Sequence, residues 1–188
     1  MIGGNLPSLG FRTFYVSKEV TSCPLSIEII KIGKKMKEAE LLKNSTMIAS
    51  LSYGKRMLIN SEIIDFDEIQ LDELLEIVDF DPIKNNLLVI GKSEPKTETP
   101  VHWIIHHARD DVNVIVQVNG EEILQRIGGK LKKTDENTPL GTLDQAKEML
   151  SILRDEKKLE ISNHGAMFVG RTMDEVEKLI FETCEGMK

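Results

Sequence analysis

The spacing of apolar residues along the first half of the chain predicts one helix followed by paired strands. Pro24 suits the first turn of a helix, and Leu25, Ile29, Ile32 and Met36 then mark one face at helical spacing. Residues 47–53 and 56–60 alternate apolar with small or polar positions around a Gly-Lys pair, which is hairpin spacing. Two more strands, separated by the turn residues of DPIKNN, are predicted at 74–80 and 87–90. The first half is therefore expected to be largely antiparallel.

The second half alternates helices with strands. A polar segment with two prolines ends where Thr99 can cap a helix whose first residue is Pro100. That helix leads into residues 112–118, a β-branched run too apolar for one wet face, which predicts a buried central strand. The remaining predicted elements are strands at 158–162 and 166–169, flanking the turn Asn163-His164-Gly165, and helices opened by the capping pairs Thr142 with Gln145 and Thr172 with Glu175.

Composition favours one globular domain. The chain has 188 residues, of which 40% are hydrophobic and 29% charged, and its apolar residues never form a run of roughly 18 or more. No membrane span is expected. Residues 1–23 lack the basic start and apolar stretch of a signal peptide, which makes the cytoplasm the expected compartment. Cys23 and Cys184 are too few and too far apart for a disulfide framework.

The formal net charge of -7 argues against a general nucleic-acid binder. Such a protein normally carries a basic face that displaces counterions from phosphates. No nucleic-acid partner is therefore expected.

Two segments carry a family resemblance. The sequence ETPVHWIIHHARDDVNVIVQV, followed later by SNHGAMFVGRTMDEVEKLI, resembles the class II aldolase and adducin family. The resemblance implies an α/β fold of three layers, α/β/α, with a central, mainly antiparallel sheet. It extends from about Pro24 to the end, which predicts a domain at 24–188 preceded by an N-terminal extension at 1–23.

The resemblance also implies a chemistry. Family members abstract a proton, or cleave a carbon-carbon bond, next to a carbonyl while a divalent metal stabilises the enediolate. Two histidines two residues apart on one strand hold that metal together with a third. Gln117 and Asn119 stand at the first two positions, and His164 stands at the third. Because amide oxygens are weak zinc ligands, zinc is possible but no cofactor is expected.

Glu98 matches the family's acid/base carboxylate, whose pKa can be raised by partial burial. Its alternative role is a helix-start carboxylate favoured by the helix dipole. Lys96 and Thr97 precede it where the family contacts the substrate's phosphate, although Lys96 could equally face water. Asn60 and Ser61 stand in the place of a second phosphate loop, so a small phosphorylated ligand is possible.

The other histidines have plainer interpretations. His164 could be a turn histidine whose ring bonds backbone carbonyls. His102 and His106 are spaced to chelate zinc from one helix face, yet structural packing is the favoured interpretation for both.

Two classes of function remain open. One is a non-catalytic binding or assembly module, similar to the adducin head. The other is a lyase or isomerase acting on a sugar-phosphate-like hydroxy-carbonyl compound, with Glu98 as acid/base. In either case the resemblance implies a homo-oligomer, with tetramers known in the family. The apolar N-terminal residues Leu9, Phe11, Phe14 and Tyr15 offer a surface that could be buried between chains.

Overall fold

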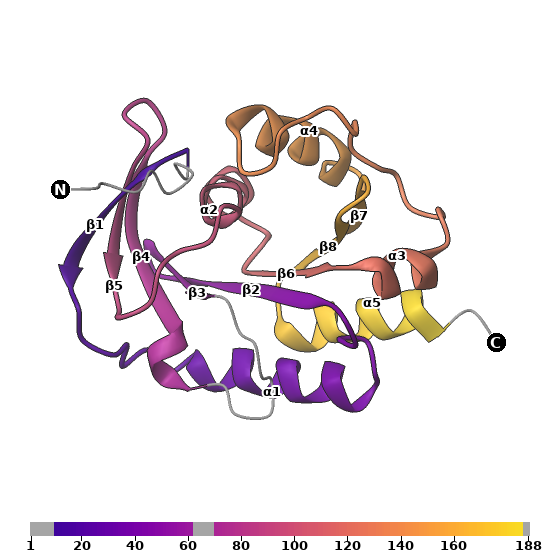
Figure 1. Cartoon of the computed structure of the whole chain (residues 1–188), viewed down its shortest axis with the longest axis horizontal. Helices are drawn as coiled ribbons and strands as arrows, with labels where there is room; N and C mark the ends of the chain where they lie inside the picture. The colour runs from indigo at the N-terminus through magenta and orange to yellow at the C-terminus, as the bar shows by residue number, and fades with distance from the viewer. Residues whose placement is uncertain (1–9, 62–69, 186–188) are drawn as a thin grey trace, which may run out of the picture.

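A mixed sheet of eight strands forms the centre of the computed structural model, which describes residues 10–61 and 70–185 (Figure 1). The strand order is β1-β5-β4-β3-β2-β6-β8-β7. β1 and β5 are parallel, and the other neighbours in this order are antiparallel. The strands are β1 (Arg12–Ser17), β2 (Thr46–Tyr53), β3 (Arg56–Asn60), β4 (Leu74–Asp81), β5 (Asn86–Ile90), β6 (Val114–Asn119), β7 (Lys158–Ile161) and β8 (Gly165–Gly170).

Helices cover both faces of the sheet. The helices are α1 (Ser26–Glu38), α2 (Thr99–Ala108), α3 (Glu121–Ile127), α4 (Leu143–Leu153) and α5 (Met173–Glu185), with a short 3-10 turn, η2 (Leu71–Glu73). One core cluster joins α1, α3 and α5 to the sheet, and a second joins α2 and α4 to the other face (Figure 1). Among the described residues, no helix is long and apolar enough to cross a bilayer.

Strand β6 contributes to both cores because successive side chains of a strand point to opposite faces. Val114, Val116 and Val118 belong to the cluster with α1, while Ile115 belongs to the cluster with α2. All six residues of β6 are buried, as the sequence predicted for this central strand. The same alternation places Gln117 on the α2 side of the sheet.

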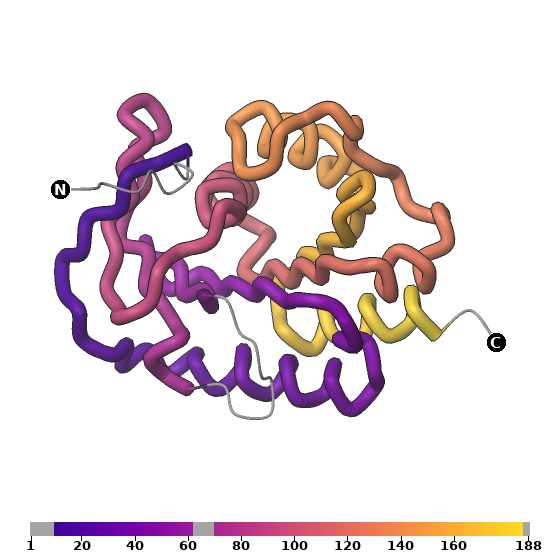
Figure 2. The backbone as a smooth tube through the Cα atoms, in the orientation of Figure 1, coloured from indigo at the N-terminus to yellow at the C-terminus, as the bar shows by residue number. Residues whose placement is uncertain are grey.

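The sequence did not predict β1 or α3. β1 lies within the expected extension 1–23, yet it pairs with β5, far along the chain, and the two run side by side in Figure 2. The segment after β1 is also fixed, since Thr21 Oγ1 donates to the buried Glu76 carboxylate at 2.6 Å. The boundary at residue 23 stays a prediction. Leu9, from the expected apolar surface, lies outside the described residues.

Candidate functional site

Two amides lie at the end of β6. Gln117 and Asn119 are both buried, and Gln117 Nε2 donates to Asn119 Oδ1 at 2.8 Å. Gln117 Oε1 lies 3.3 Å from His102 Nε2 on α2. The carbonyl oxygens of both amides therefore already have neighbours within the protein.

Glu98 and His164 meet beside these amides. Glu98 precedes the first residue of α2, His164 lies in the turn between β7 and β8, and His164 Nε2 is 3.3 Å from Glu98 Oε1. The turn is held against β6, because the Gly120 backbone N–H donates to the His164 carbonyl at 2.9 Å. A Cβ at Gly165 would lie only 2.1 Å from the Val118 carbonyl oxygen. Only glycine fits there, so the strand contact fixes His164 next to Glu98.

The start of α2 differs from the prediction in one respect. The helix begins at Thr99 with Glu98 at the N-cap position, and no side chain caps it. Thr99 lies inside the helix with its Oγ1 buried and without a hydrogen-bond partner, so the predicted Thr99 cap was wrong. The caps at Thr142 and Thr172 are confirmed, since each hydroxyl accepts the predicted backbone N–H at 3.2 Å.

The pKa of Glu98 is lowered, whereas the family resemblance suggested that burial could raise it. Burial does raise the pKa of this carboxyl, but the hydrogen bond and charge of His164, a backbone hydrogen bond and the nearby His102 outweigh it. Glu98 is therefore a carboxylate at neutral pH. It can accept a proton more readily than donate one.

The other predicted ligand-binding residues have different surroundings. Asn60 is buried and uses its side chain on backbone groups, accepting from Ala49 N and donating to the carbonyls of Met47 and Ser61. This side chain continues the pairing of β3 with β2, which favours a structural role for Asn60. Ser61 is buried next to it, and its backbone N–H donates to the Glu73 carbonyl.

Lys96 and Thr97 are half-buried in the loop before Glu98. The backbone of Gly141 approaches this loop so closely that a Cβ there would lie 2.4 Å from the Thr97 carbonyl oxygen. The segment before α4 is therefore packed against the loop that carries Glu98. Whether these side chains bind phosphate stays a prediction.

Two serines that the sequence did not single out connect the buried histidines. Ser50 Oγ lies 2.8 Å from His102 Nδ1 and 2.9 Å from His106 Nε2, and Ser52 Oγ lies 3.0 Å from His106 Nδ1. The signal was present as two small polar residues, two apart, in the predicted strand 47–53. His107 is exposed and stacks on Trp103 at 3.9 Å between ring centroids.

The side chains at the site are a poor match to zinc. Among the residues that the structure describes, no three His, Cys, Asp or Glu side chains gather as a metal site requires. At the positions that the resemblance matches to paired metal-ligand histidines, Gln117 and Asn119 are neutral amides joined by one hydrogen bond. Zinc prefers imidazole, thiolate or carboxylate ligands.

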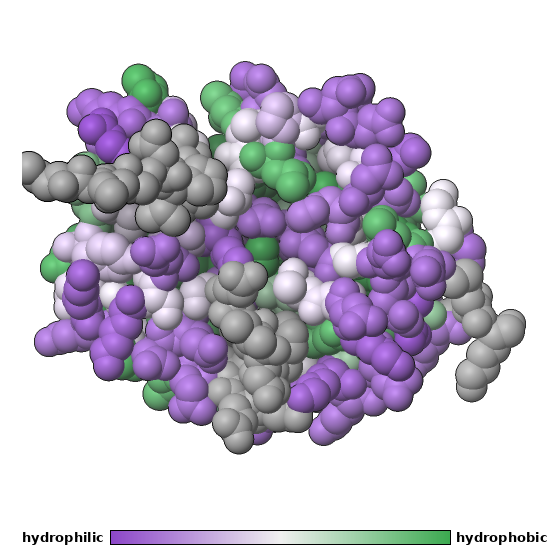
Figure 3. Space-filling model, in the orientation of Figure 1, coloured by the Kyte–Doolittle hydropathy of each residue, from purple (hydrophilic) through white to green (hydrophobic). Residues whose placement is uncertain are grey.

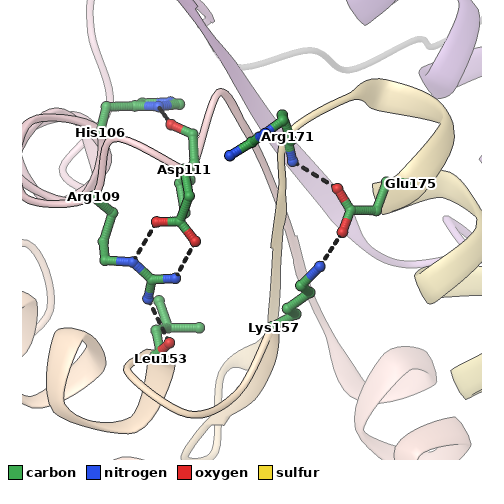
Figure 4. A network of polar contacts seen from close by, with 8 residues as sticks. His106, Arg109, Asp111, Leu153, Lys157, Arg171 and Glu175 are labelled. Atoms are coloured by element: carbon green, nitrogen blue, oxygen red, sulfur yellow. Dashed lines mark hydrogen bonds and ion pairs between the residues drawn. The ribbon is translucent and has the colours of Figure 1, made fainter.

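A charged cluster lies where β6 begins and β8 ends, at the opposite end of β6 from Gln117 and Asn119. Figure 4 shows this cluster from close by. Arg109 forms two hydrogen bonds with Asp111, at 2.8 and 2.7 Å, and Lys157 pairs with Glu175. The Arg109 guanidinium lowers the pKa of Asp111 to about 2. These pairs line a cavity of about 310 Å³ together with Arg171.

Comparison with known proteins shows the family. The family model for the Class II Aldolase and Adducin N-terminal domain matches residues 27–122, which is 96 of the 188 residues. No curated protein matches the sequence.

Solved structures share the fold at low identity. An L-fuculose 1-phosphate aldolase is similar with a TM-score of 0.67 and 22% identity, over 88% of this chain and 84% of that one. The l-fuculose-1-phosphate aldolase from Thermus thermophilus has a TM-score of 0.66 and 16% identity, over 86% and 89%. A sugar-phosphate aldolase from Thermotoga maritima has a TM-score of 0.64 and 12% identity, over 84% and 90%. The predicted class II aldolase fold is thereby confirmed, and the chain belongs to the class II aldolase and adducin family.

Proposed function

We propose that this family member binds a small sugar-phosphate-like hydroxy-carbonyl compound at a site in which hydrogen bonding replaces zinc. The observation that carries the proposal is the hydrogen bond that Gln117 Nε2 donates to Asn119 Oδ1, at 2.8 Å, beside the Glu98–His164 pair. A zinc ion at these positions would have to displace His102 from one amide oxygen and Gln117 from the other. The amides are instead suited to bind oxygen-rich ligands.

The primary proposal is a non-catalytic binding or assembly module. In a metal-dependent family, loss of the cation removes the main electrostatic stabilisation of an enediolate, which is worth several kcal/mol. A second candidate is a lyase or isomerase. Its support is Glu98, which is ionised at neutral pH and 3.3 Å from His164, so it could take a proton next to a carbonyl.

Calorimetry with L-fuculose 1-phosphate, in buffer containing a strong chelator, tests this proposal. Binding is expected to be unchanged by the chelator, because the amides, Glu98 and His164 act without metal. Glu98→Gln is expected to weaken binding roughly 10- to 100-fold, the usual cost of losing a hydrogen bond to a charged group. Glu94→Gln, on the exposed part of the same loop, is the matched control and should bind as the unmodified protein does.

Two results would separate the candidates. Binding that disappears with the chelator would contradict the metal-free site. Cleavage or isomerisation of the compound in the chelator, lost in Glu98→Gln, would favour the enzyme over the non-catalytic module.

We also propose that the chain forms a homo-oligomer, with a tetramer as the expected state. β1 is the first strand of the sheet order, and Phe14 and Val16 on it are 49% and 59% exposed. An edge strand with exposed apolar side chains is a ready surface for a second copy. The face of the molecule drawn in Figure 3 is largely hydrophilic, with its apolar residues in small groups between polar ones.

Light scattering at micromolar concentration tests the oligomer. The unmodified chain should have a multiple of the monomer mass, and the double variant Phe14→Asp/Val16→Asp should shift it toward the monomer. Ile83→Asp is the control, because Ile83 is 92% exposed on the turn between β4 and β5. A monomer mass for the unmodified chain would refute the proposal.

A further inference from the structure

A continuous chain of polar contacts runs through the core from β2 to the candidate site. Apart from Ser52, every side chain in it is buried. The contacts join Ser52 Oγ to His106 Nδ1 at 3.0 Å, His106 Nε2 to Ser50 Oγ at 2.9 Å, Ser50 Oγ to His102 Nδ1 at 2.8 Å, His102 Nε2 to Gln117 Oε1 at 3.3 Å, and Gln117 Nε2 to Asn119 Oδ1 at 2.8 Å.

The two histidines in this series of contacts, His102 and His106, each carry one ring proton at neutral pH. Burial lowers the pKa of His102 to about 4 and that of His106 to about 3. A neutral imidazole donates with one nitrogen and accepts with the other, so it transmits the direction of the hydrogen bonds from one neighbour to the next. A serine hydroxyl between two rings does the same.

The Gln117 amide determines the direction in which the hydrogen bonds are donated along this series of contacts. Gln117 Oε1 can only accept, so His102 must carry its proton on Nε2 and accept at Nδ1 from the Ser50 hydroxyl. Ser50 Oγ then accepts from His106 Nε2, which leaves His106 Nδ1 as an acceptor for the Ser52 hydroxyl. All five contacts are satisfied when every donor points from Ser52 toward Asn119.

One group opposes this direction. The Val112 carbonyl oxygen lies 3.1 Å from His106 Nδ1, and a carbonyl can only accept. A proton on Nδ1 would reverse every bond in the chain and would require both amides to turn over. In the first direction His106 Nδ1 is an acceptor, and of these two neighbours only the Ser52 hydroxyl can donate to it.

We infer that Ser52, His106, Ser50 and His102 are positioning residues that hold the Gln117 and Asn119 oxygens inward and leave the Asn119 N–H groups for a ligand. The ligand atom recognised there is an oxygen that accepts hydrogen bonds, as in a carbonyl or carboxylate, and not a cation. The inference rests on the proposed function for its ligand. The hydrogen-bond direction itself can be measured without one.

Nitrogen-15 spectra of the histidine rings in the full chain at pH 7 measure that direction. His102 and His106 should both be Nε2–H tautomers, and His107→Gln and His164→Gln identify the remaining signals by elimination. His107 is an internal reference, because its Nδ1 lies 2.9 Å from the Trp103 carbonyl, which favours a proton on Nδ1. Nδ1–H tautomers at both buried histidines would overturn the inference.

Ser52→Ala removes the terminal donor and leaves the Val112 carbonyl as the partner of His106 Nδ1. Both buried rings should then switch to Nδ1–H, whereas Ser52→Thr, which keeps the hydroxyl, should leave them unchanged. Unchanged tautomers in Ser52→Ala would also overturn the inference. Because Asn119 would now present its oxygen, Ser52→Ala should weaken L-fuculose 1-phosphate binding roughly tenfold.

The proposed function and the inferred positioning role are refuted by different results. Nε2–H tautomers that switch in Ser52→Ala support the positioning chain even if L-fuculose 1-phosphate does not bind, and the absence of binding counts against the proposed function alone. Binding that is equal in the unmodified protein and in a Ser52→Ala variant with switched tautomers would refute the assigned ligand atom.

Discussion

Replacing Gln117 and Asn119 together by histidine is expected to convert a chain that purifies with substoichiometric zinc into one that binds zinc tightly. Both side chains start from one end of β6, and the contact between β6 and β8 already fixes His164 beside them. Three imidazoles would then face one point. The gain in affinity should exceed the roughly 10- to 100-fold that a single outer-shell partner contributes, because two direct ligands are added.

Elemental analysis of the unmodified protein and competition with a chromophoric chelator for the variant measure this change. Asn113→His is the control, because Asn113 is exposed just before the other end of the same strand and should add no tight site. Adding His164→Ala to the double variant should remove the tight site. Activity need not return, since small misplacements of reacting groups are costly. One tightly held zinc per unmodified chain, lost on His164→Ala, would contradict the metal-free site.

Acidification is expected to destabilise the fold through His102 and His106 well above the range in which most carboxylates titrate. Burial lowers their pKa values to about 4 and about 3, while an unfolded histidine titrates near 6.5. The folded protein therefore keeps its full stability above about pH 6.5. Between pH 6.5 and the lowered pKa values the unfolded chain binds protons that the folded protein does not, so the free energy of unfolding falls with the pH. Each histidine should cost about 1.4 kcal/mol per pH unit in that window.

Between pH 7 and 4.5 the two histidines together should lower the free energy of unfolding by about 4 to 5 kcal/mol, much of a typical domain's stability. Urea unfolding at a series of pH values above 5 measures the slope with little contribution from carboxylates. His107→Gln should keep the slope, and His102→Gln should roughly halve it whatever its effect at pH 7. A free energy of unfolding that is flat from pH 7 to 5 would show that these rings are not buried in the neutral form.

Local patterns were sufficient to predict the parts of the fold that depend on neighbouring residues. The hairpin of β2 and β3, the buried β6 and the Thr142 cap each follow from spacing or capping chemistry within a few residues. The family resemblance added the convergence of Glu98 and His164, which are 66 positions apart.

What could not be predicted depends on contacts between distant segments. β1 is half-exposed, and its partner β5 lies more than sixty residues later, so its sequence alone does not distinguish it from an irregular extension. The pKa of Glu98 is lowered although the side chain is buried, because the contact with His164, which lies in the turn between β7 and β8, outweighs the effect of burial. Ser50 became informative only when α2 placed two histidines against it.

The parallel pairing of β1 with β5 has a consequence for the order of folding. Arg12 pairs with Asn86, so β1 can form its ladder only after the chain between them has closed a long loop, whereas β2 to β5 pair as antiparallel neighbours along the chain. Closing that loop costs chain entropy before the contact stabilises anything. β1 should therefore dock after β2 to β5 have paired during refolding. Because β1 is a half-exposed edge strand and β6 is buried along its length, the amide hydrogens of β1 should exchange with solvent before those of β6 in the native protein.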